Sequence, residues 1–345
     1  MMNQLNRKNI INGLKLTLAI SIIVSVVVLI WTMDIEELKK MTHVRPEYLG
    51  LAFVVLLAMI LTQGLRLKIL ARALDTTLSM KEGIKNYLVG AFVANVTPFS
   101  SGGGPVQVLF LQKQVGMSFG GASSIIIVQW LLRQIIFGIL APIFYLTSSE
   151  LIDPGKIPTR LFELAVGGSV ALTVGLLFFV WKPQVIPVLA KGIARFPGIK
   201  GLLENNEKYR LKFNELIDWA YHEIEVFHES LWTLAIRKKW EMFLTTLFTV
   251  VFWTLYFLVA PVILLGLGAE PHFGRALLMQ TIMFLILPYV PTPGATGAAE
   301  IGFAAFFAPF VPFHLLGIVM VSWRFMTFYL LILLGSATTL KMLNE

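Results

Sequence analysis

The chain contains long apolar blocks, and these limit its fold more than any other feature. Six of them can cross a bilayer as helices, because a helix rises about 1.5 Å per residue and the hydrocarbon core is about 30 Å thick. Only 14% of the residues are charged, too few to cover the surface of a soluble protein. The sequence therefore predicts an all-α integral membrane protein, a polytopic helical bundle. The candidate spans are residues 14–32, 48–65, 119–147, 161–181, 241–266 and 313–340.

Lysine and arginine gather in the polar segments between these blocks and leave a net charge of +8. They are frequent before the first block, in residues 66–85, and in residues 182–239, whereas residues 148–160 carry few. Since cytoplasmic loops are enriched in these residues, we expect a multi-pass protein of the cytoplasmic (inner) cell membrane with its N-terminus in the cytoplasm. No aromatic-basic surface motif accompanies the charge, so we expect no nucleic acid as a partner.

Several kinds of chemistry find no support in the sequence. The chain has no cysteine, and its five histidines do not pair at a metal-binding helical spacing, so we expect no metal site. No phosphate-binding loop of the Gly-x-x-x-x-Gly-Lys-Ser/Thr type occurs, and we find no Ser/His/Asp arrangement and no paired catalytic carboxylates. We therefore expect neither a cofactor nor an enzymatic reaction.

We interpret residues 1–345 as a single transmembrane domain. Residues 14–32 form a retained first helix, and residues 48–181 and 241–340 form two halves. The polar segment 182–239 between them is expected in the cytoplasm. It contains an apolar stripe at helical spacing, typical of a helix that lies on the membrane or packs under the bundle. The stripe consists of Phe213, Leu216, Ala220, Ile224, Phe227, Leu231 and Leu234.

Two further apolar stretches, residues 84–115 and 274–310, are each interrupted by proline and glycine. The interruptions read NVTPFSSGGGPVQ at 95–107 and PYVPTPGATGAAE at 288–300. The helix before the first break covers about 21 Å, too short to cross the membrane. Irregular backbone at membrane depth survives only where protein or a water-filled cavity solvates it. Each break is therefore predicted to lie inside the protein.

These breaks predict two re-entrant helical hairpins, with returning helices that begin near Pro105 and Thr296. Helix N-termini at such tips attract anions. With the topology above, the first hairpin enters from the cytoplasm and the second from outside, which gives inverted-topology repeats. Two ordinary kinked helices remain the alternative. The residues that we expect to shape the tips are Thr97, Pro98, Gly102, Gly103, Gly104, Pro105, Pro291, Pro293 and Gly294.

Two arginines occur within apolar spans, Arg133 in 119–147 and Arg324 in 313–340, and each lies in the helix after a broken segment. An arginine at this depth is costly and should face the bundle interior. Guanidinium groups suit phosphate oxygens, so one hypothesis is that both arginines bind a phosphate-bearing head group. The alternative is a structural ion pair, for which Glu300 is the obvious carboxylate. The amides of Gln107 and Gln129 are further head-group candidates, although Gln129 also suits an interhelical hydrogen bond. Arg66 is interpreted mainly as a topology signal.

Residues 96–107, Arg133, residues 291–300 and Arg324 occur in an order that resembles the flippase-like family. Its best-known member is the membrane region of bacterial lysylphosphatidylglycerol synthase, and the resemblance covers residues 10–340. It implies an inverted-repeat bundle that moves lipids between leaflets. In the synthase a soluble aminoacyl-transferase domain follows, whereas little follows the last span here, so the resemblance implies no transferase activity. Many relatives carry Glu shortly after the first glycine turn, where this chain has Gln107.

The resulting hypothesis is a flippase for an anionic phospholipid or a lipid linked to polyprenyl phosphate. Its expected partners are membrane lipids and their anionic head groups, and a homo-oligomer is a further possibility. Two alternatives remain, a secondary transporter of a small soluble anion and a non-catalytic accessory protein of cell-envelope lipid synthesis. The sequence leaves the lipid, the direction and the energy source of transport undetermined.

Overall fold

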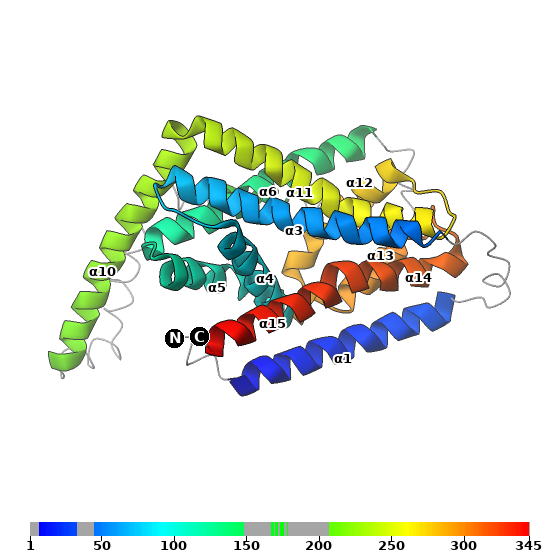
Figure 1. Cartoon of the computed structure of the whole chain (residues 1–345), viewed down its shortest axis with the longest axis horizontal. Helices are drawn as coiled ribbons and strands as arrows, with labels where there is room; N and C mark the ends of the chain where they lie inside the picture. The colour runs from blue at the N-terminus through cyan, green and yellow to red at the C-terminus, as the bar shows by residue number, and fades with distance from the viewer. Residues whose placement is uncertain are drawn as a thin grey trace.

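The computed structural model describes residues 7–32, 45–147 and 207–344, together with a few residues between 167 and 178. All regular structure in these residues is helical. Figure 1 shows long helices lying roughly along one direction. The main helices are α1 (Arg7–Thr32), α3 (Glu47–Ala73), α4 (Met80–Val96), α5 (Gly103–Phe110), α6 (Phe119–Thr147), α10 (Glu207–Trp232), α11 (Lys239–Gly266), α12 (Phe273–Ile286), α13 (Ala298–Phe307), α14 (Phe313–Arg324) and α15 (Leu330–Asn344).

Four helical stretches among the described residues are long and apolar enough to cross a membrane: Glu47–Ala73, Phe119–Leu140, Lys239–Gly266 and Phe313–Met342. The last joins α14 and α15 through a π-helical turn at Phe325–Tyr329. Leu18–Thr32 within α1 and Phe273–Tyr289 are shorter apolar stretches. Most of the candidate span 161–181 lies outside the described residues. The second span was predicted to end at residue 65, but α3 continues to Ala73, and Arg66 within it is buried in the bundle.

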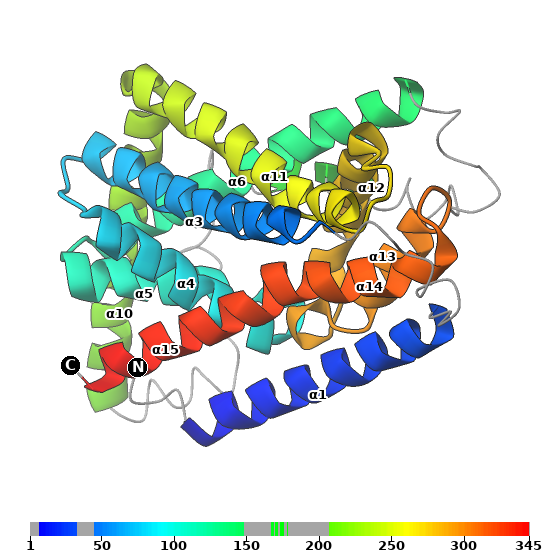
Figure 2. The same ribbon diagram turned by 45° about the vertical axis from the view of Figure 1, so that its right-hand side comes forward.

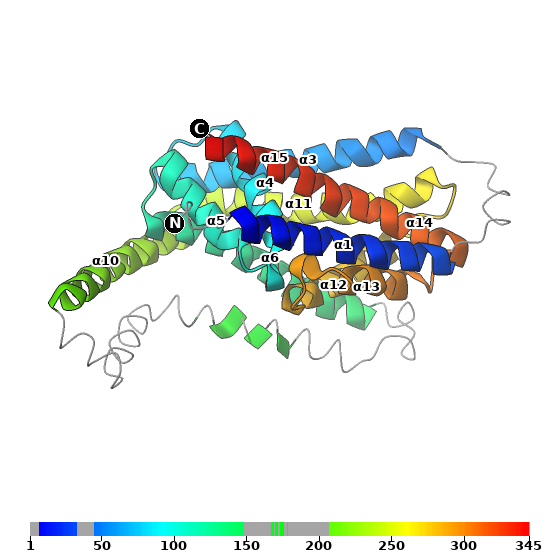
Figure 3. The same cartoon turned by 90° about the horizontal axis from the view of Figure 1, so that it is seen from below.

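The outward faces of several long helices carry large apolar side chains exposed to the surroundings. Along α1, Ile23 is 62% exposed and Ile30 is 65% exposed, and Val54 of α3 is 58% exposed. Isolated exposed apolar residues are normal in soluble proteins, but continuous apolar helix faces are a feature of lipid contact. Figures 2 and 3 show α1 alongside α14 and α15 at the edge of the bundle.

Both broken segments consist of a helix, an irregular break and a second helix. The first is α4, the break with a 3₁₀ turn at Pro98–Ser100, and α5. The second is α12, 3₁₀ turns at Leu287–Tyr289 and Pro293–Ala295, and α13. Figures 1 and 2 place α4 and α5 toward the end of the bundle where α10 and the C-terminus lie, and α12 and α13 toward the other end.

The two breaks contact each other at Gly294, which is buried and has a φ of 58°. The prediction that each break lies inside the protein holds only in part, because Pro98, Phe99 and Pro291 are exposed. A Cβ atom at Gly294 would lie 2.9 Å from the carbonyl oxygen of Asn95 in the first segment and 2.6 Å from the ring of Phe328. Glycine is needed here for two reasons, the left-handed backbone and the close approach of the other segment. Residues nearly 200 positions apart in the sequence therefore form one central junction.

The polar segment contains the helix α10, over the part of the segment where the apolar stripe was predicted. It packs on α6 and extends away from the bundle in Figure 3. Leu231 and Leu234 of the predicted stripe are buried, but Leu216 is 56% exposed and Ile217 is buried in its place. The buried face of α10 therefore contains Ile217 at this point in place of the predicted Leu216. The side chain of Phe213 lies outside the described residues.

A close contact holds α10 against the start of α6. The Glu223 carboxylate accepts a 2.6 Å hydrogen bond from the backbone N–H of Gly120, in the first turn of α6. A Cβ atom at Gly120 would lie 2.3 Å from the backbone carbonyl oxygen of Glu223. A methyl group cannot fit against a rigid helix backbone at that distance, so this glycine permits the two helices to touch.

We expect Gly120→Ala to separate α10 from α6. The residue lies within a helix, so alanine should favour the local helix by about 1 kcal/mol, and any loss comes from the helix contact. Limited proteolysis in detergent should then cleave α10 at least several-fold faster than in the wild type. Gly138→Ala is the matched control, because a Cβ atom at Gly138 meets open space. Equal protection of both variants would contradict this account of the contact.

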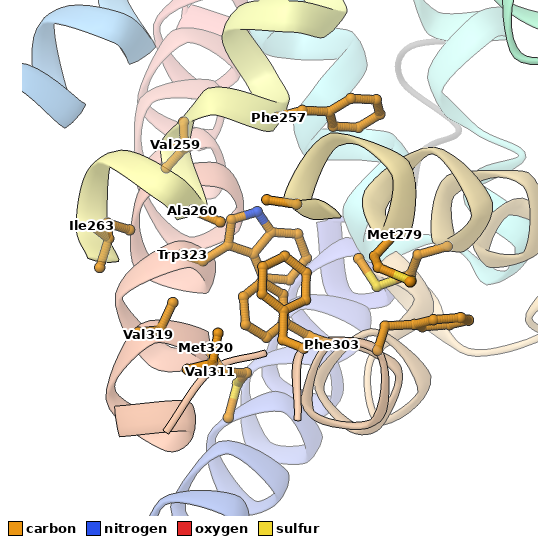
Figure 4. Packing of buried hydrophobic residues seen from close by; sticks show 14 of the residues in the cluster. Phe257, Val259, Ala260, Ile263, Met279, Phe303, Val311, Val319, Met320 and Trp323 are labelled. Atoms are coloured by element: carbon orange, nitrogen blue, oxygen red, sulfur yellow. The ribbon is translucent and has the colours of Figure 1, made fainter. Parts of the chain in front are cut away.

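The largest apolar cluster lies around α11, α12, α13 and α14 (Figure 4). Trp323 of α14 is 1% exposed, and its ring stacks on Phe303 of α13 with ring centroids 4.8 Å apart. Phe303 in turn stacks on Phe307. This packing fixes the end of α14 and therefore the position of Arg324, the residue that follows Trp323.

Candidate functional site

A cavity of about 380 Å³ lies beside the junction of the two broken segments. Its wall includes residues of α3, α4, α5, α6, α11, α12 and α14, and both breaks contribute. Arg66, Arg133 and Arg324 all line it, and none of the described lining residues is Asp, Glu, Lys or His. The remaining wall is largely aromatic and apolar, with Trp130, Phe252, Trp253, Tyr256 and Phe284 among its members.

Arg66 of α3 is only 3% exposed and begins a chain of hydrogen bonds. Its Nη1 donates to Oε1 of Gln63 at 2.5 Å, and Nε2 of Gln63 donates to Oε1 of Gln129 at 2.7 Å. Because arginine can only donate, the oxygen of Gln63 must face it, and this fixes the orientation of both amides. The relay leaves three N–H-bearing atoms without a protein partner, namely Nε and Nη2 of Arg66 and Nε2 of Gln129.

Arg133 lies in α6 on another side of the cavity. Its Nη2 donates to Oε1 of Gln134 at 3.1 Å, and its guanidinium carbon lies 5.7 Å from the ring centroid of Trp130. The Nε atom is buried and has no hydrogen-bond partner. No carboxylate of a described residue lines the cavity to balance this charge.

Arg324 differs from the other two arginines because a buried carboxylate contacts it. Its Nε lies 2.8 Å from Oε1 of Glu300, which is fully buried in α13. The same oxygen accepts a 2.6 Å hydrogen bond from Ser21 of α1, and Oε2 accepts from the backbone N–H of Gly297 at 2.8 Å. This pair therefore ties α1, α13 and α14 together. Nη2 of Arg324 stays without a partner.

The unpaired buried side-chain atoms of the lining residues share one property, which is that each of them donates hydrogen bonds. A buried donor without a partner costs about 1–3 kcal/mol, so native proteins rarely keep several together without a ligand. The arrangement suits an anion whose oxygens only accept. These atoms are Nε and Nη2 of Arg66, Nε2 of Gln129, Nε of Arg133, Nε1 of Trp323 and Nη2 of Arg324.

Gln107 of α5 also lines the cavity, and a glycine makes room for it. A Cβ atom at Gly90 of α4 would lie 2.5 Å from Cγ of Gln107 and 2.7 Å from its Nε2. The side chain of Gln107 therefore lies directly over the glycine. The amide of Asn86 donates to the backbone carbonyl of Gln107 at 2.9 Å and holds the middle of α5 against α4.

Of the five head-group candidates from the sequence, Arg133, Arg324, Gln107 and Gln129 line the cavity. Glu300 does not line the cavity. It forms an ion pair with Arg324, which is the alternative that the sequence analysis gave for this arginine. Among the predicted tip residues, Gly103, Gly104 and Gly294 line the cavity, whereas the structure does not place the following in its wall: Thr97, Pro98, Gly102, Pro105, Pro291 and Pro293.

Sequence reasoning assigned Arg66 mainly to topology and did not single out Gln63 or the aromatic residues of α11. A usable signal was present, because residues three apart lie on one face of a helix and Gln63 precedes Arg66 by three. The aromatic wall from α11 carried no such signal, since aromatic residues are common in every apolar helix.

Comparison with known proteins gives a consistent result over most of the chain. The family model described as "Lysylphosphatidylglycerol synthase TM region" matches residues 18–335. A UPF0104 membrane protein of Archaeoglobus fulgidus is 27% identical over 323 residues, which cover 92% of this chain and 94% of that protein. A UPF0104 membrane protein of Pyrococcus horikoshii is 25% identical over 332 residues, covering 92% and 93%. No solved structure matches this protein.

Proposed function

We propose that this multi-pass membrane protein, which belongs to the family of the lysylphosphatidylglycerol synthase transmembrane region, moves an anionic lipid between the two leaflets of a cell membrane. In this proposal the cavity holds the lipid head group. The observation that carries it is the set of three arginines and further unpaired donors around a space without a lining carboxylate among the described residues.

The cavity wall supports a lipid rather than a fully hydrated ion as the ligand. Aromatic side chains such as Trp253, Tyr256 and Phe284 line the same cavity as the three arginines. A phospholipid has an anionic phosphate joined to an apolar part, which matches this mixture. The exposed apolar faces of the surrounding helices are consistent with lipid on all sides.

The two broken segments supply a route for transport in this proposal. They approach the cavity from opposite ends of the bundle, as expected of re-entrant hairpins in an inverted repeat. Separation of their tips in turn would open the cavity to one leaflet and then to the other. The close contact of Gly294 with Asn95 would be the part of the barrier that has to move.

The proposal is tested by leaflet exchange of labelled anionic phospholipids in proteoliposomes. We expect the wild type to exchange lipid and Arg133→Gln to lower the initial rate about tenfold or more, because a charge-assisted hydrogen bond contributes about 1.5–3 kcal/mol. Arg72→Gln is the matched control, since Arg72 carries the same charge but is exposed near the end of α3.

Equal exchange by the wild type and Arg133→Gln would reject the cavity as the head-group site. Absence of exchange for every anionic lipid, with folded protein, would reject lipid transport. Uptake of a small soluble anion by those same proteoliposomes would then favour the alternative transporter.

A further inference from the structure

The charges around the cavity can be counted from the contacts of the three arginines. Glu300 lies 2.8 Å from Nε of Arg324 and neutralises it, because both groups are buried. Arg66 and Arg133 have hydrogen bonds to neutral glutamine amides, which leave their charge unchanged. Since no described lining residue is acidic, the cavity carries two positive charges that the described lining residues do not balance.

Two buried positive charges call for two negative ones in the ligand. Buried charge is costly unless it is paired, and a ligand of charge −1 would leave one guanidinium uncompensated. A phosphate monoester carries a charge of about −1.5 to −2 at pH 7, because its second pKa is about 6. A phosphate diester, by contrast, carries only one negative charge.

The unpaired donors favour the same ligand. Nε and Nη2 of Arg66 lie on one edge of the guanidinium, and both are buried and unpaired. This edge can bind two phosphate oxygens at once if neighbouring side chains move to admit the ligand. Nε2 of Gln129, Nε of Arg133 and Nη2 of Arg324 add further donors. A terminal phosphate offers three oxygens free of ester bonds, whereas a diester offers two.

We propose that the cavity selects a lipid that ends in a phosphate monoester over one whose phosphate is a diester, and that neutral Gln107 sets this preference. The inference rests on the proposed function, because it assumes that the cavity holds the head group. Glutamate at position 107 would have the same shape and would lower the unbalanced charge from two to one. The preference for the dianion should then be lost.

Binding to the purified full chain in detergent tests the inference by isothermal titration calorimetry. The probes are dihexanoyl phosphatidic acid, a monoester, dihexanoyl phosphatidylglycerol, a diester, and inorganic phosphate. We expect the wild type to bind the monoester at least tenfold more tightly than the diester at pH 7.5. Gln107→Glu should reduce this ratio to about one. Gln114→Glu, an identical change at an exposed position just after α5, should keep the wild-type ratio.

The pH dependence of lipid binding gives a second test, which uses only the wild-type protein. Lowering the pH from 7.5 to 5.5 protonates the monoester and should weaken its binding to the wild type several-fold. The described cavity wall contains no histidine or carboxylate that would titrate over this range. Binding of the diester over the same range is the internal control and should change little.

Equal or tighter binding of the diester by the wild type would overturn the inference. Arginine-dependent exchange of that diester in proteoliposomes would then leave lipid transport standing, so the two failures are distinguishable. If inorganic phosphate binds as tightly as phosphatidic acid, the cavity does not require the lipid part of the ligand, and the inference is overturned. If Gln107→Glu does not fold, Arg133→Gln removes one charge by another route, and an unchanged ratio in that variant would also overturn the inference.

Discussion

Replacing Glu300 with alanine should destabilise the protein more than any other single change in the described bundle. The substitution leaves the Arg324 guanidinium buried without its carboxylate and removes the acceptor of Ser21 and of the Gly297 backbone N–H. Breaking a buried ion pair by removing one partner costs about 3–5 kcal/mol. Thermal unfolding in detergent, followed by intrinsic tryptophan fluorescence, should show a midpoint well below that of the wild type.

A second substitution distinguishes a buried charge from a simple packing defect. Arg324→Met removes the stranded charge while it keeps an unbranched apolar side chain. The double variant with Glu300→Ala should therefore recover part of the lost stability, because apolar replacement of a whole buried pair is often neutral. If Glu300→Ala unfolds at the wild-type temperature, the pair does not hold α1, α13 and α14 together.

The Arg66→Gln variant should lose lipid exchange almost completely while it keeps its orientation in the membrane. Arg66 contributes one of the two unbalanced charges and two unpaired donors, so we expect a rate about 10- to 100-fold below the wild type. The measurement is the proteoliposome exchange assay. Orientation is read in the same vesicles by labelling single cysteines introduced into loops, which is straightforward because the chain has none of its own.

Lys68→Gln is the matched control on the same helix. Lys68 is exposed, whereas Arg66 is buried in the cavity wall two residues earlier. If Arg66 served only as a topology signal, both variants would behave alike, with normal exchange in correctly oriented protein. That result would remove Arg66 from the site. Loss of exchange in Arg66→Gln alone places its role in the cavity.

The two broken segments show which features of the fold could be predicted from sequence patterns. Proline and glycine at 98–105 and 291–297 predicted where the helices stop, because proline lacks an N–H and glycine permits left-handed backbone. That reason holds at Gly294 and Gly297, whereas in the first break Phe99 and Ser100 have the positive φ values and Gly103 begins α5. The structure has breaks in both places. Their contact with each other could not be predicted, since the approach of Gly294 to the Asn95 carbonyl depends on how α4 and α12 pack.

At the candidate site, the arginines also show what the sequence could predict and what required the structure. Their occurrence in apolar spans identified Arg133 and Arg324 as unusual, but the sequence treated them as equivalent. The structure separates them, because Arg324 has a carboxylate 2.8 Å away, whereas Arg133 donates a hydrogen bond to the neutral amide of Gln134 and lies beside the ring of Trp130. Arg66 was assigned to topology because it lies at the end of a predicted span, and its burial is known only from the structure.

The sequence by itself determined that this protein is a helical membrane bundle with two interrupted segments, because hydrophobic length and backbone-breaking residues are local properties. It also identified Arg133 and Arg324 as costly charges within apolar spans, although it did not identify Arg66. Only the tertiary structure decided which of those charges are balanced, which donors stay unpaired, and that residues from seven helices and both breaks surround one cavity. Pairing and burial depend on contacts between distant segments, and no local pattern encodes the distance between two helices.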